Sequence, residues 1–117
     1  MEILIIEDEE DNVVLQEKIC QHAGYTTTIA KTGQEALAAV AKKNYDLILV
    51  DLLLPDINGL DLAKELLKIN PKFRLIFTTA FVTDKHRKDI SDLKCELLVK
   101  PYTPKQLTDV IAKPKAA

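Results

Sequence analysis

Two patterns of apolar residues alternate along this chain. Short runs rich in Ile, Leu and Val are typical of buried β-strands, and the stretches between them repeat apolar residues every three or four positions, as one face of a helix does. Five such pairs follow one another, with no internal repeat. The expected strands are Glu2–Ile6, Tyr25–Ala30, Leu47–Asp51, Phe73–Thr79 and Glu96–Val99.

The segments between the strands carry the signals that begin and end helices. Gly24 follows the first segment, where glycine commonly ends a helix. In the stretch TPKQ, Thr103 is expected to cap the last helix, with Pro104 as its first residue and Gln106 completing a capping box. The other expected helices run from Asp11 or Asn12 to Ala23 and over Gln34–Lys43, Leu60–Ile69 and Asp84–Lys94.

This succession of strand–helix units indicates an α/β fold with a parallel sheet. Right-handed crossovers place helices on both faces of such a sheet, and strands that are apolar nearly throughout agree with burial on both faces. In an open parallel sheet, ligands bind outside the carboxyl ends of the strands. The residues that end the strands are therefore the first place to look for a functional site.

One strand ends in a charge that needs partners. The stretch LILVDLLLPDING places Asp51 inside an apolar run from Leu47 to Leu54. An unpaired carboxylate buried there would cost on the order of several kcal/mol. Three acids, one hydroxyl and one ammonium group are expected to meet at this edge, because the other strands end in Glu7 and Asp8, in Thr79 and in Lys100.

These groups suit phosphoryl transfer, in which catalysis is mainly positioning and charge neutralisation. Neighbouring carboxylates repel one another, and a cation compensates them. Oxygen ligands without His or Cys favour Mg²⁺, with Mn²⁺ as an alternative. In this interpretation Asp51 attacks phosphorus and becomes an acyl phosphate, Asp8 binds the metal, and Glu7 does so directly or through water. Lys100 and the Thr79 hydroxyl bind the phosphoryl oxygens.

Four stretches in order resemble the receiver domain of two-component response regulators, the CheY-like family with a flavodoxin-like fold. They are ILIIEDEEDN with the acidic pair, LILVDLLLPDINGLDL with the phosphoacceptor, IFTTA with the hydroxyl residue and LLVKPY with the lysine and proline. The resemblance implies a (βα)5 doubly wound sheet of order 2-1-3-4-5. It also implies a single domain over residues 1–117, of which 112–117 form a tail or the start of a linker.

For function, the resemblance implies a signalling domain that accepts a phosphoryl group on Asp51 from a sensor histidine kinase or a histidine phosphotransfer protein. Such a domain catalyses only its own phosphorylation and dephosphorylation. It switches conformation to control an output domain, a downstream protein or a relay, as a monomer or as a dimer formed on phosphorylation. The resemblance further implies that Leu53 lends its backbone carbonyl to the metal and that the Lys100–Pro101 peptide is cis.

The sequence departs from the family pattern in three places. Leu97 stands where the family has an aromatic residue that turns with the hydroxyl residue, and DLKCELL replaces a Gly-Ala pair before the fifth strand. Glu7 replaces the commoner Asp. Leu53 and Phe81, both apolar, are expected to flank the path of an attacking water without orienting it, which predicts a long-lived phosphorylated form.

Composition agrees with one soluble cytoplasmic domain. The chain has 117 residues, 47% of them hydrophobic and 29% charged, and a net charge of −2. That balance gives no support for direct nucleic-acid binding. No apolar run approaches the roughly 20 residues that span a bilayer, and the acidic N-terminus is not a basic leader. Cys20 and Cys95 are expected to be reduced thiols.

Three other interpretations are weaker. A haloacid-dehalogenase-like phosphatase also uses an aspartyl phosphate, Mg²⁺ and a lysine, but it places its nucleophile on the first strand and a second Asp at the position of Leu53. A flavodoxin-like cofactor binder is disfavoured because the acids of residues 7–11 would repel a flavin phosphate. A pseudo-receiver that serves only as a docking surface lacks an active-site residue, and no central residue is missing here.

Several polar and aromatic residues are expected to have structural roles. His86 is interpreted as a solvent-exposed side chain and Tyr102 as a packing residue. Asp56 and Asn58 are expected to shape the loop before Gly59 rather than to bind a metal.

Overall fold

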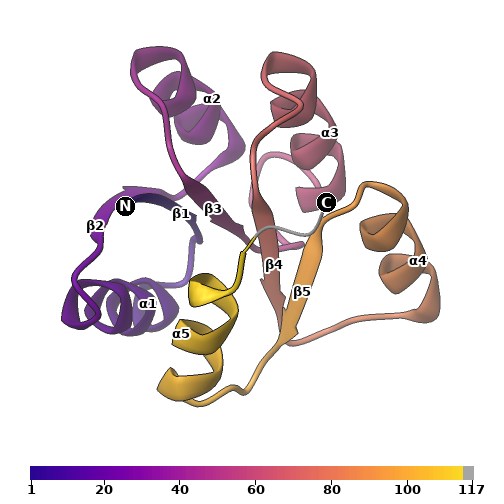
Figure 1. Ribbon diagram of the computed structural model, residues 1–117. Helices are drawn as coiled ribbons and strands as arrows, with labels where there is room; N and C mark the ends of the chain where they lie inside the picture. Colours follow the sequence, from indigo (N-terminus) through magenta and orange to yellow (C-terminus); the bar gives the residue numbers. More distant parts are fainter. Residues whose placement is uncertain (115–117) are drawn as a thin grey trace.

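The computed structural model describes residues 1–114, and in this range strands and helices alternate as predicted (Figure 1). The strands are β1 (Glu2–Ile6), β2 (Thr26–Ala30), β3 (Leu47–Val50), β4 (Leu75–Thr79) and β5 (Glu96–Val99). The helices are α1 (Glu10–His22), α2 (Gly33–Lys42), α3 (Gly59–Ile69), α4 (Asp84–Asp92) and α5 (Pro104–Ala112).

The strands form one parallel sheet in the order β2-β1-β3-β4-β5, which confirms the expected flavodoxin-like topology. The register brings the carboxyl ends of neighbouring strands to the same edge. Ile6 at the end of β1 pairs with Ala30 of β2 and with Val50 of β3, and Thr79 at the end of β4 pairs with Val99 of β5. The residues that follow these strands therefore emerge close together.

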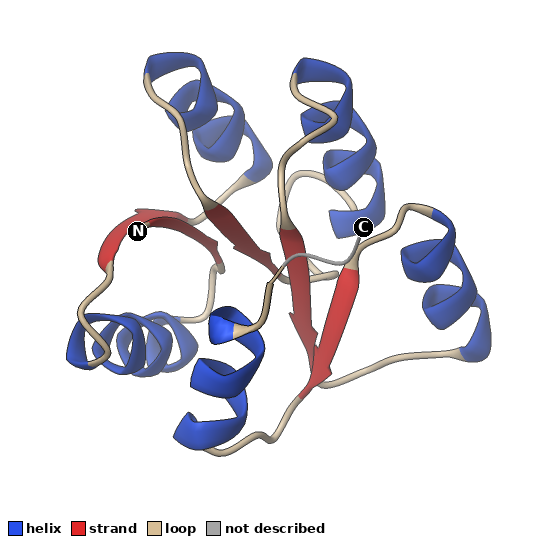
Figure 2. Ribbon diagram, in the orientation of Figure 1, coloured by secondary structure: helices blue, strands red, loops and turns tan. Residues whose placement is uncertain are grey.

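Helices cover both faces of the sheet (Figures 1 and 2). Helices α1 and α5 lie on one face, and α2, α3 and α4 lie on the other. Side chains alternate between the faces along each strand, so β1 sends Ile3 and Ile5 toward α1 and α5, and Leu4 and Ile6 toward the other three helices. Cys20 packs on the first of these faces, where burial raises the pKa of its thiol to about 11.

Local sequence explains most helix ends. After α1, Gly24 adopts the left-handed conformation, with φ of 92°. Its N–H donates to the carbonyl of Gln21, and that of Tyr25 to the carbonyl of Cys20. These two bonds form a Schellman motif. At the start of α5, Thr103 and Gln106 form the predicted capping box.

The interpretation of His86 as a solvent-exposed side chain was wrong. It is half-buried, and its Nδ1 accepts a hydrogen bond from the N–H of Thr83 at 3.2 Å. Its own N–H donates to Thr83 Oγ1, so the two residues form a second capping box at the start of α4. The sequence signal was obscured because this position of a capping box normally holds Glu or Gln.

A few boundaries differ from the prediction. Strand β4 begins at Leu75, because the N–H of Phe73 still donates to the Asn70 carbonyl in the turn after α3 and Arg74 offers only its carbonyl to Ile48 of β3. Helix α4 ends at Asp92, and Lys94, which was predicted to continue it, has a left-handed φ of 58°. The expected tail began one residue too early, because Ala112 is the last residue of α5. Residues 113 and 114 lie beyond the helix, and residues 115–117 lie outside the described part of the chain. No helix over residues 1–114 is long and apolar enough to cross a bilayer.

Candidate functional site

A pocket of about 210 Å³ opens at the carboxyl edge of the sheet, where the sequence places the candidate residues. Four of the predicted site residues line it, namely Asp8, Asp51, Thr79 and Lys100, together with Leu53 at its mouth. Glu7 lies beneath them, fully buried. The remaining lining residues are Glu9, Asn12, Ala80 and Phe81. The structure thus brings together every residue of the predicted site.

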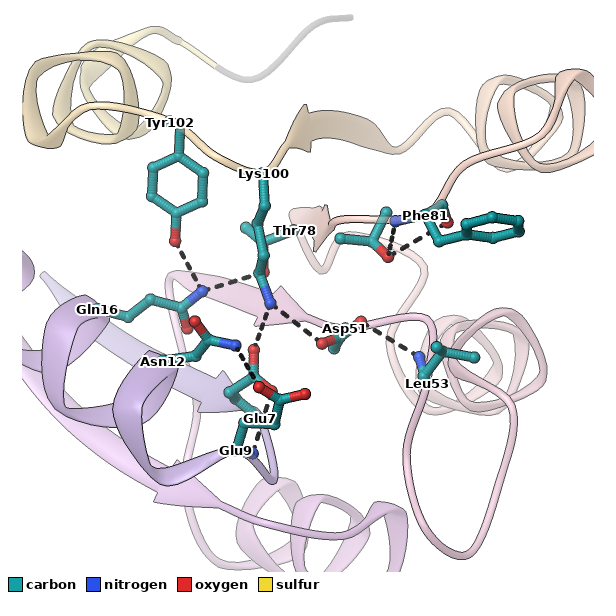
Figure 3. Close-up of polar contacts among 11 residues, drawn as sticks. Glu7, Glu9, Asn12, Gln16, Asp51, Leu53, Thr78, Phe81, Lys100 and Tyr102 are labelled. Atoms are coloured by element: carbon teal, nitrogen blue, oxygen red, sulfur yellow. Dashed lines mark hydrogen bonds and ion pairs between the residues drawn. The ribbon is translucent and has the colours of Figure 1, made fainter.

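Lys100 connects the two buried carboxylates of the site (Figure 3). Its Nζ lies 2.7 Å from Glu7 Oε1 and 3.2 Å from Asp51 Oδ2. The other oxygen of Asp51, Oδ1, accepts a hydrogen bond from the N–H of Leu53 at 3.2 Å. The carboxylate that interrupts the apolar run of β3 is therefore paired and hydrogen-bonded, and its orientation is fixed from two sides.

Burial and charge shift the ionisation of this pair. Burial, and secondarily the charge of Asp51, raise the pKa of Glu7 despite its hydrogen bond from Lys100. Burial alone would lower the pKa of Lys100, but the hydrogen bond to Glu7 and the charge of Asp51 more than offset it and raise that pKa. The two directions are compatible because one ammonium faces two carboxylates. Lys100 therefore stays charged, and the two carboxylates together can carry more negative charge than the single ammonium neutralises.

Backbone hydrogen bonds hold the site residues just beyond the strand ends. The N–H of Glu7 donates to the Ala30 carbonyl at 3.0 Å, that of Asp51 to the Ile6 carbonyl at 3.2 Å, and that of Lys100 to the Thr79 carbonyl at 2.8 Å. The ladder therefore extends one residue past β1, β3 and β5, and the side chains of these three residues start from a rigid base. The Lys100–Pro101 peptide is cis, as the resemblance implied.

The loop after Asp51 is shaped by the residues expected to do so. Asn58 Oδ1 accepts from the N–H of Leu60 and caps α3. Asp56 accepts from the N–H groups of two residues at the start of α2, Gly33 at 2.9 Å and Gln34 at 3.0 Å, and these bonds lower its pKa. A methyl group at Gly59 would collide with the backbone carbonyl oxygen of Asp51, so glycine permits the close approach of α3.

The mouth of the pocket is apolar, and the Thr79 hydroxyl has only long hydrogen bonds. Leu53 and Phe81, which follow the carboxyl ends of the neighbouring strands β3 and β4, are 67% and 68% exposed. Thr79 is buried, and its Oγ1 lies 3.4 Å from both the nitrogen and the carbonyl oxygen of Phe81. These distances are well above the usual length of hydroxyl hydrogen bonds. The Thr79 hydroxyl can therefore change partners at low cost.

The acids do not form a ready cage for a metal. Over residues 1–114, no group of three or more His, Cys, Asp or Glu side chains is arranged as a metal site. Glu7 turns toward Lys100, and its second oxygen accepts from the N–H of Glu9 at 3.3 Å. Asp8 is exposed at the pocket. The cation that separates Glu7 from Asp51 in this structure is thus the Lys100 ammonium.

Sequence reasoning missed two residues beside the site, Gln16 and Thr78. Gln16 of α1 is buried and donates from Nε2 to Tyr102 and Thr78, so Tyr102 has a polar contact as well as a packing role. One signal could have found Gln16, because it follows Val13 and precedes Ile19 at helical spacing and so shares their buried face. Leu97, at the position of the family's aromatic residue, pairs with Phe77 of β4 and packs against the core beneath α2–α4.

The model of the response regulator receiver domain family matches residues 3–112 of this chain. The aerobic respiration control sensor protein ArcB of Escherichia coli K12 is 33% identical over 116 residues, which cover 97% of this chain and 15% of ArcB. The transcriptional regulatory protein CusR of the same strain is 33% identical over 103 residues, which cover 87% of this chain and 45% of CusR. The chain therefore spans less than half the length of these relatives.

Solved structures agree with the sequence matches. The response regulator protein TrrA of Thermotoga maritima, in complex with Mg²⁺-BeF, superimposes with a TM-score of 0.84 at 32% identity, covering 94% of this chain and 95% of that chain. A CheY-like receiver domain protein of Methanospirillum hungatei gives a TM-score of 0.90 at 27% identity, covering 94% and 89%. By fold, by sequence and by the span of the family match, this chain belongs to the family of response regulator receiver domains.

Proposed function

We propose that Asp51 accepts a phosphoryl group from a phosphohistidine of a sensor histidine kinase or a histidine phosphotransfer protein. The observation that carries this proposal is the contact of Lys100 Nζ with Asp51 Oδ2 at 3.2 Å, in a pocket open at the carboxyl edge of the sheet. A carboxylate nucleophile then lies beside a fixed positive charge and can be reached by a donor. Phosphoryl transfer depends chiefly on such positioning and charge neutralisation.

In the transfer step, one carboxylate oxygen of Asp51 bonds to phosphorus while the bond from phosphorus to the histidine nitrogen breaks. That nitrogen keeps the electron pair, and Asp51 becomes an acyl phosphate. Oxygens of the moving group carry the negative charge, and charge-assisted donors bind them strongly. We assign this role to the Lys100 ammonium and to the Thr79 hydroxyl, whose present bonds are long.

We propose Mg²⁺ as the metal of this site, with Mn²⁺ as an alternative of similar ligand preference. The carboxylates of Asp8 and Asp51 and the backbone carbonyl of Leu53 would hold it, and Glu7 would act through water because Lys100 occupies its carboxylate. The donor set fits, since the pocket lining over the described residues offers oxygen ligands and no His or Cys. When bound, the ion neutralises charge on the phosphoryl oxygens. The complex of TrrA with Mg²⁺-BeF supports this choice.

We further propose that residues 1–117 are a single signalling domain, in which a tail or linker begins after Ala112. It would act as a phosphoacceptor rather than as an enzyme on other substrates, and would control an attached output domain or a downstream protein. The relatives support this, because a sensor protein and a transcriptional regulatory protein both contain the domain. We propose a cytoplasmic location, no direct contact with nucleic acid or membrane, and a monomer or a phosphorylation-dependent dimer.

The test is incubation with Mg²⁺ and acetyl phosphate, followed by intact mass. We expect one added phosphoryl group in the wild type and in Asp61→Asn, a matched control for an exposed carboxylate at the start of α3. We expect none in Asp51→Asn or in the presence of a chelator. Transfer from a phosphorylated histidine kinase in the same assay tests the donor class.

Three outcomes would overturn the proposal. Phosphorylation of Asp51→Asn at the wild-type rate would assign the group to another residue, and an unmodified wild type under all donors would leave a docking module. Steady turnover of phosphomonoesters would instead favour the phosphatase. That interpretation is already weakened because Asp51 follows β3, and the residue two positions later is Leu53.

A further inference from the structure

We infer that Gln16 is a positioning residue for Lys100 and acts through a buried hydrogen-bonded cluster with Thr78 and Tyr102. The inference rests on the phosphoryl transfer proposed above. Gln16 is 1% exposed on α1, and its Nε2 donates to Tyr102 OH at 2.8 Å and to Thr78 Oγ1 at 3.2 Å. Figure 3 shows the amide between these two side chains, joined to each by a dashed line.

The cluster fixes the segment that carries Lys100 on both sides of Pro101. On one side, the N–H of Lys100 donates to the Thr79 carbonyl at 2.8 Å. On the other, the ring of Tyr102 packs into the core under α1 and α5, and its hydroxyl accepts from Gln16. Pro101 itself is exposed. Without the second anchor, the base of the Lys100 side chain would be held from one side only.

The same amide links three elements that meet at the site. Gln16 belongs to α1, Thr78 lies in β4 directly before Thr79, and Tyr102 lies between β5 and α5. The cluster therefore connects the helix after the acidic residues to the strand that carries the hydroxyl and to the segment that carries the lysine. Lys100 Nζ lies 3.2 Å from Asp51 Oδ2, at the long end of the range for hydrogen bonds. A small movement of the segment that carries Lys100 would therefore weaken this contact.

Stability alone does not account for a glutamine at this position. Gln16 Oε1 is the buried side-chain atom without a hydrogen-bond partner among residues 1–114. A buried unpartnered acceptor costs about 1–3 kcal/mol, and replacing a whole buried polar cluster by apolar groups of similar shape can be neutral or stabilising. Rotating the amide by half a turn would let Oε1 accept from both hydroxyls but would leave Nε2 without a partner. In either orientation the same three residues are tied together.

Tyr102 can link Gln16 to the segment that carries Lys100 without adding a charge, because its hydroxyl stays protonated. Burial raises the pKa of Tyr102, and the hydrogen bond from Gln16 and the charge of Lys100 oppose this only in part. The hydroxyl is therefore neutral over the range in which a receiver domain works, and it accepts from Gln16 without adding a charge beside Lys100. A carboxylate here would compete with Asp51 for the ammonium.

The test compares Gln16→Leu, Tyr102→Phe and the double variant in the acetyl phosphate assay. Gln21→Leu is the matched control, because Gln21 is another glutamine of α1 whose Nε2 donates to Thr27 at an exposed site. We measure the maximal phosphorylation rate, the half-saturating concentrations of donor and Mg²⁺, and stability by urea unfolding. Tyr102→Phe removes a single oxygen, so it decides the question if Gln16→Leu fails to fold.

We expect each single variant to lower the maximal rate about tenfold, because small misplacements of a positioned group have effects of this order or larger. The half-saturating concentrations and the rate of Gln21→Leu should stay at wild-type values. The double variant should be no slower than the slower single variant, since both remove the same link. If Gln16 and Tyr102 had only a structural role, the variants would lose stability. They would show neither the selective loss of maximal rate nor the lack of additivity in the double variant.

Three results would overturn the inference. Single-variant rates within about twofold of the wild type, which is the usual scatter of independent sites, would show that Lys100 needs no such support. Effects of Gln16→Leu and Tyr102→Phe that multiply in the double variant would show that the residues act separately. A wild type that takes no phosphoryl group would overturn the proposed function, and with it this inference.

Discussion

Two ion pairs lie at opposite ends of the sheet, one buried and one partly buried, and they are built differently. At the carboxyl edge, the Lys100 ammonium faces Glu7 and Asp51. At the other end, Arg74 binds both oxygens of Glu96, from Nε at 2.8 Å and from Nη2 at 2.9 Å. Arg74 also donates to the last turn of α5, to the carbonyls of Ile111 at 3.0 Å and of Val110 at 2.7 Å.

The difference teaches which pair serves stability and which serves chemistry. The planar guanidinium of Arg74 is matched to one carboxylate and two helix carbonyls, so its charge and most of its N–H groups are satisfied. The compact ammonium of Lys100 faces more negative charge than it carries, beside a pocket open to further ligands. We call the Arg74–Glu96 pair saturated, because its charge and most of its donors are satisfied, and it fixes the end of α5. The Lys100 cluster is unsaturated, because negative charge is left over, and it leaves room for a cation and a phosphoryl group.

The largest expected effect comes from breaking the saturated pair. Arg74→Met leaves Glu96 and the two α5 carbonyls without their donor. Removing one member of a buried pair typically costs about 3–5 kcal/mol, and we expect the lower end, about 3 kcal/mol, because Glu96 is 28% exposed. Urea unfolding measures this loss. Lys105→Met is the control, because the Lys105–Asp109 pair is exposed and of a kind worth about 0.3–0.5 kcal/mol. A similar loss in the two variants would contradict the assigned role of Arg74.

At the other end of the sheet, Lys100→Met should affect rate more than stability. Removing one donor to a charged transition state costs about 100-fold or more in rate. We therefore expect a phosphorylation rate lower by at least this factor, together with a smaller loss of stability than in Arg74→Met. Folded Arg74→Met, assayed in parallel, should be phosphorylated at a rate near that of the wild type. If both variants lost rate equally, the separation of roles between the two ends would be wrong.

A tenfold effect is expected at the mouth of the pocket. Leu53→Asn introduces an amide that can orient a water toward the acyl phosphate, so we expect the phosphorylated form to decay about ten times faster, a barrier change of about 1.4 kcal/mol. Loss of the phosphoryl group is followed by intact mass after removal of the donor. Phe81→Leu, which keeps an apolar side chain, is the control. Equal lifetimes of Leu53→Asn and wild type would refute the role of the apolar mouth.

The excess of acid at the site predicts a smaller, pH-dependent effect. The pKa of Glu7 is raised in the folded state, chiefly by burial. The stability that protonated Glu7 contributes is present at low pH and is lost as the pH rises through its raised pKa. Relative to Glu7→Gln, the wild type should therefore lose stability as the pH increases from about 4.3, the ordinary glutamate pKa, toward neutrality. Thermal unfolding in chelator measures this, and parallel curves would contradict it.

The site end of this comparison could be predicted from the sequence, whereas the saturated pair could not. Asp51, Thr79 and Lys100 were identifiable because each follows a short apolar run, and parallel strands deliver their ends to one edge. Arg74 gave no such signal, since its partners lie 22, 36 and 37 positions away. An arginine before a strand is usually exposed, and only packing reveals that the last turn of α5 covers this one.

Element boundaries follow the same rule. Strand β5 and the start of α5 were predicted to the residue, because an apolar run and a capping box are local signals. The contacts of Gln16 were missed because its partners, Thr78 and Tyr102, are distant in sequence and brought close only by the fold. The capping role of His86 was missed because His stands there in place of the usual Glu or Gln. Lys94 was assigned to α4 because a lysine normally favours helix, whereas the structure uses it in the turn that ends the helix.

The smallest expected effect concerns that turn, at the end of the sheet away from the site. The N–H of Lys94 donates to the Ser91 carbonyl at 2.9 Å and that of Cys95 to the Ile90 carbonyl at 3.1 Å, a Schellman motif like the one at Gly24 but with a lysine in the left-handed position. A left-handed L-residue costs roughly 1–2 kcal/mol, and glycine loses about 0.5–1 kcal/mol of that through its greater backbone freedom. Lys94→Gly should therefore gain about 0.5–1 kcal/mol of stability in urea unfolding. Gly24→Ala should lose a comparable amount by backbone strain alone, because the added methyl group meets no atom within 4 Å.

Neither variant should change the phosphorylation rate, because both lie away from the carboxyl edge. A changed rate in Lys94→Gly would mean that the turn before β5 belongs to the switch rather than to the scaffold.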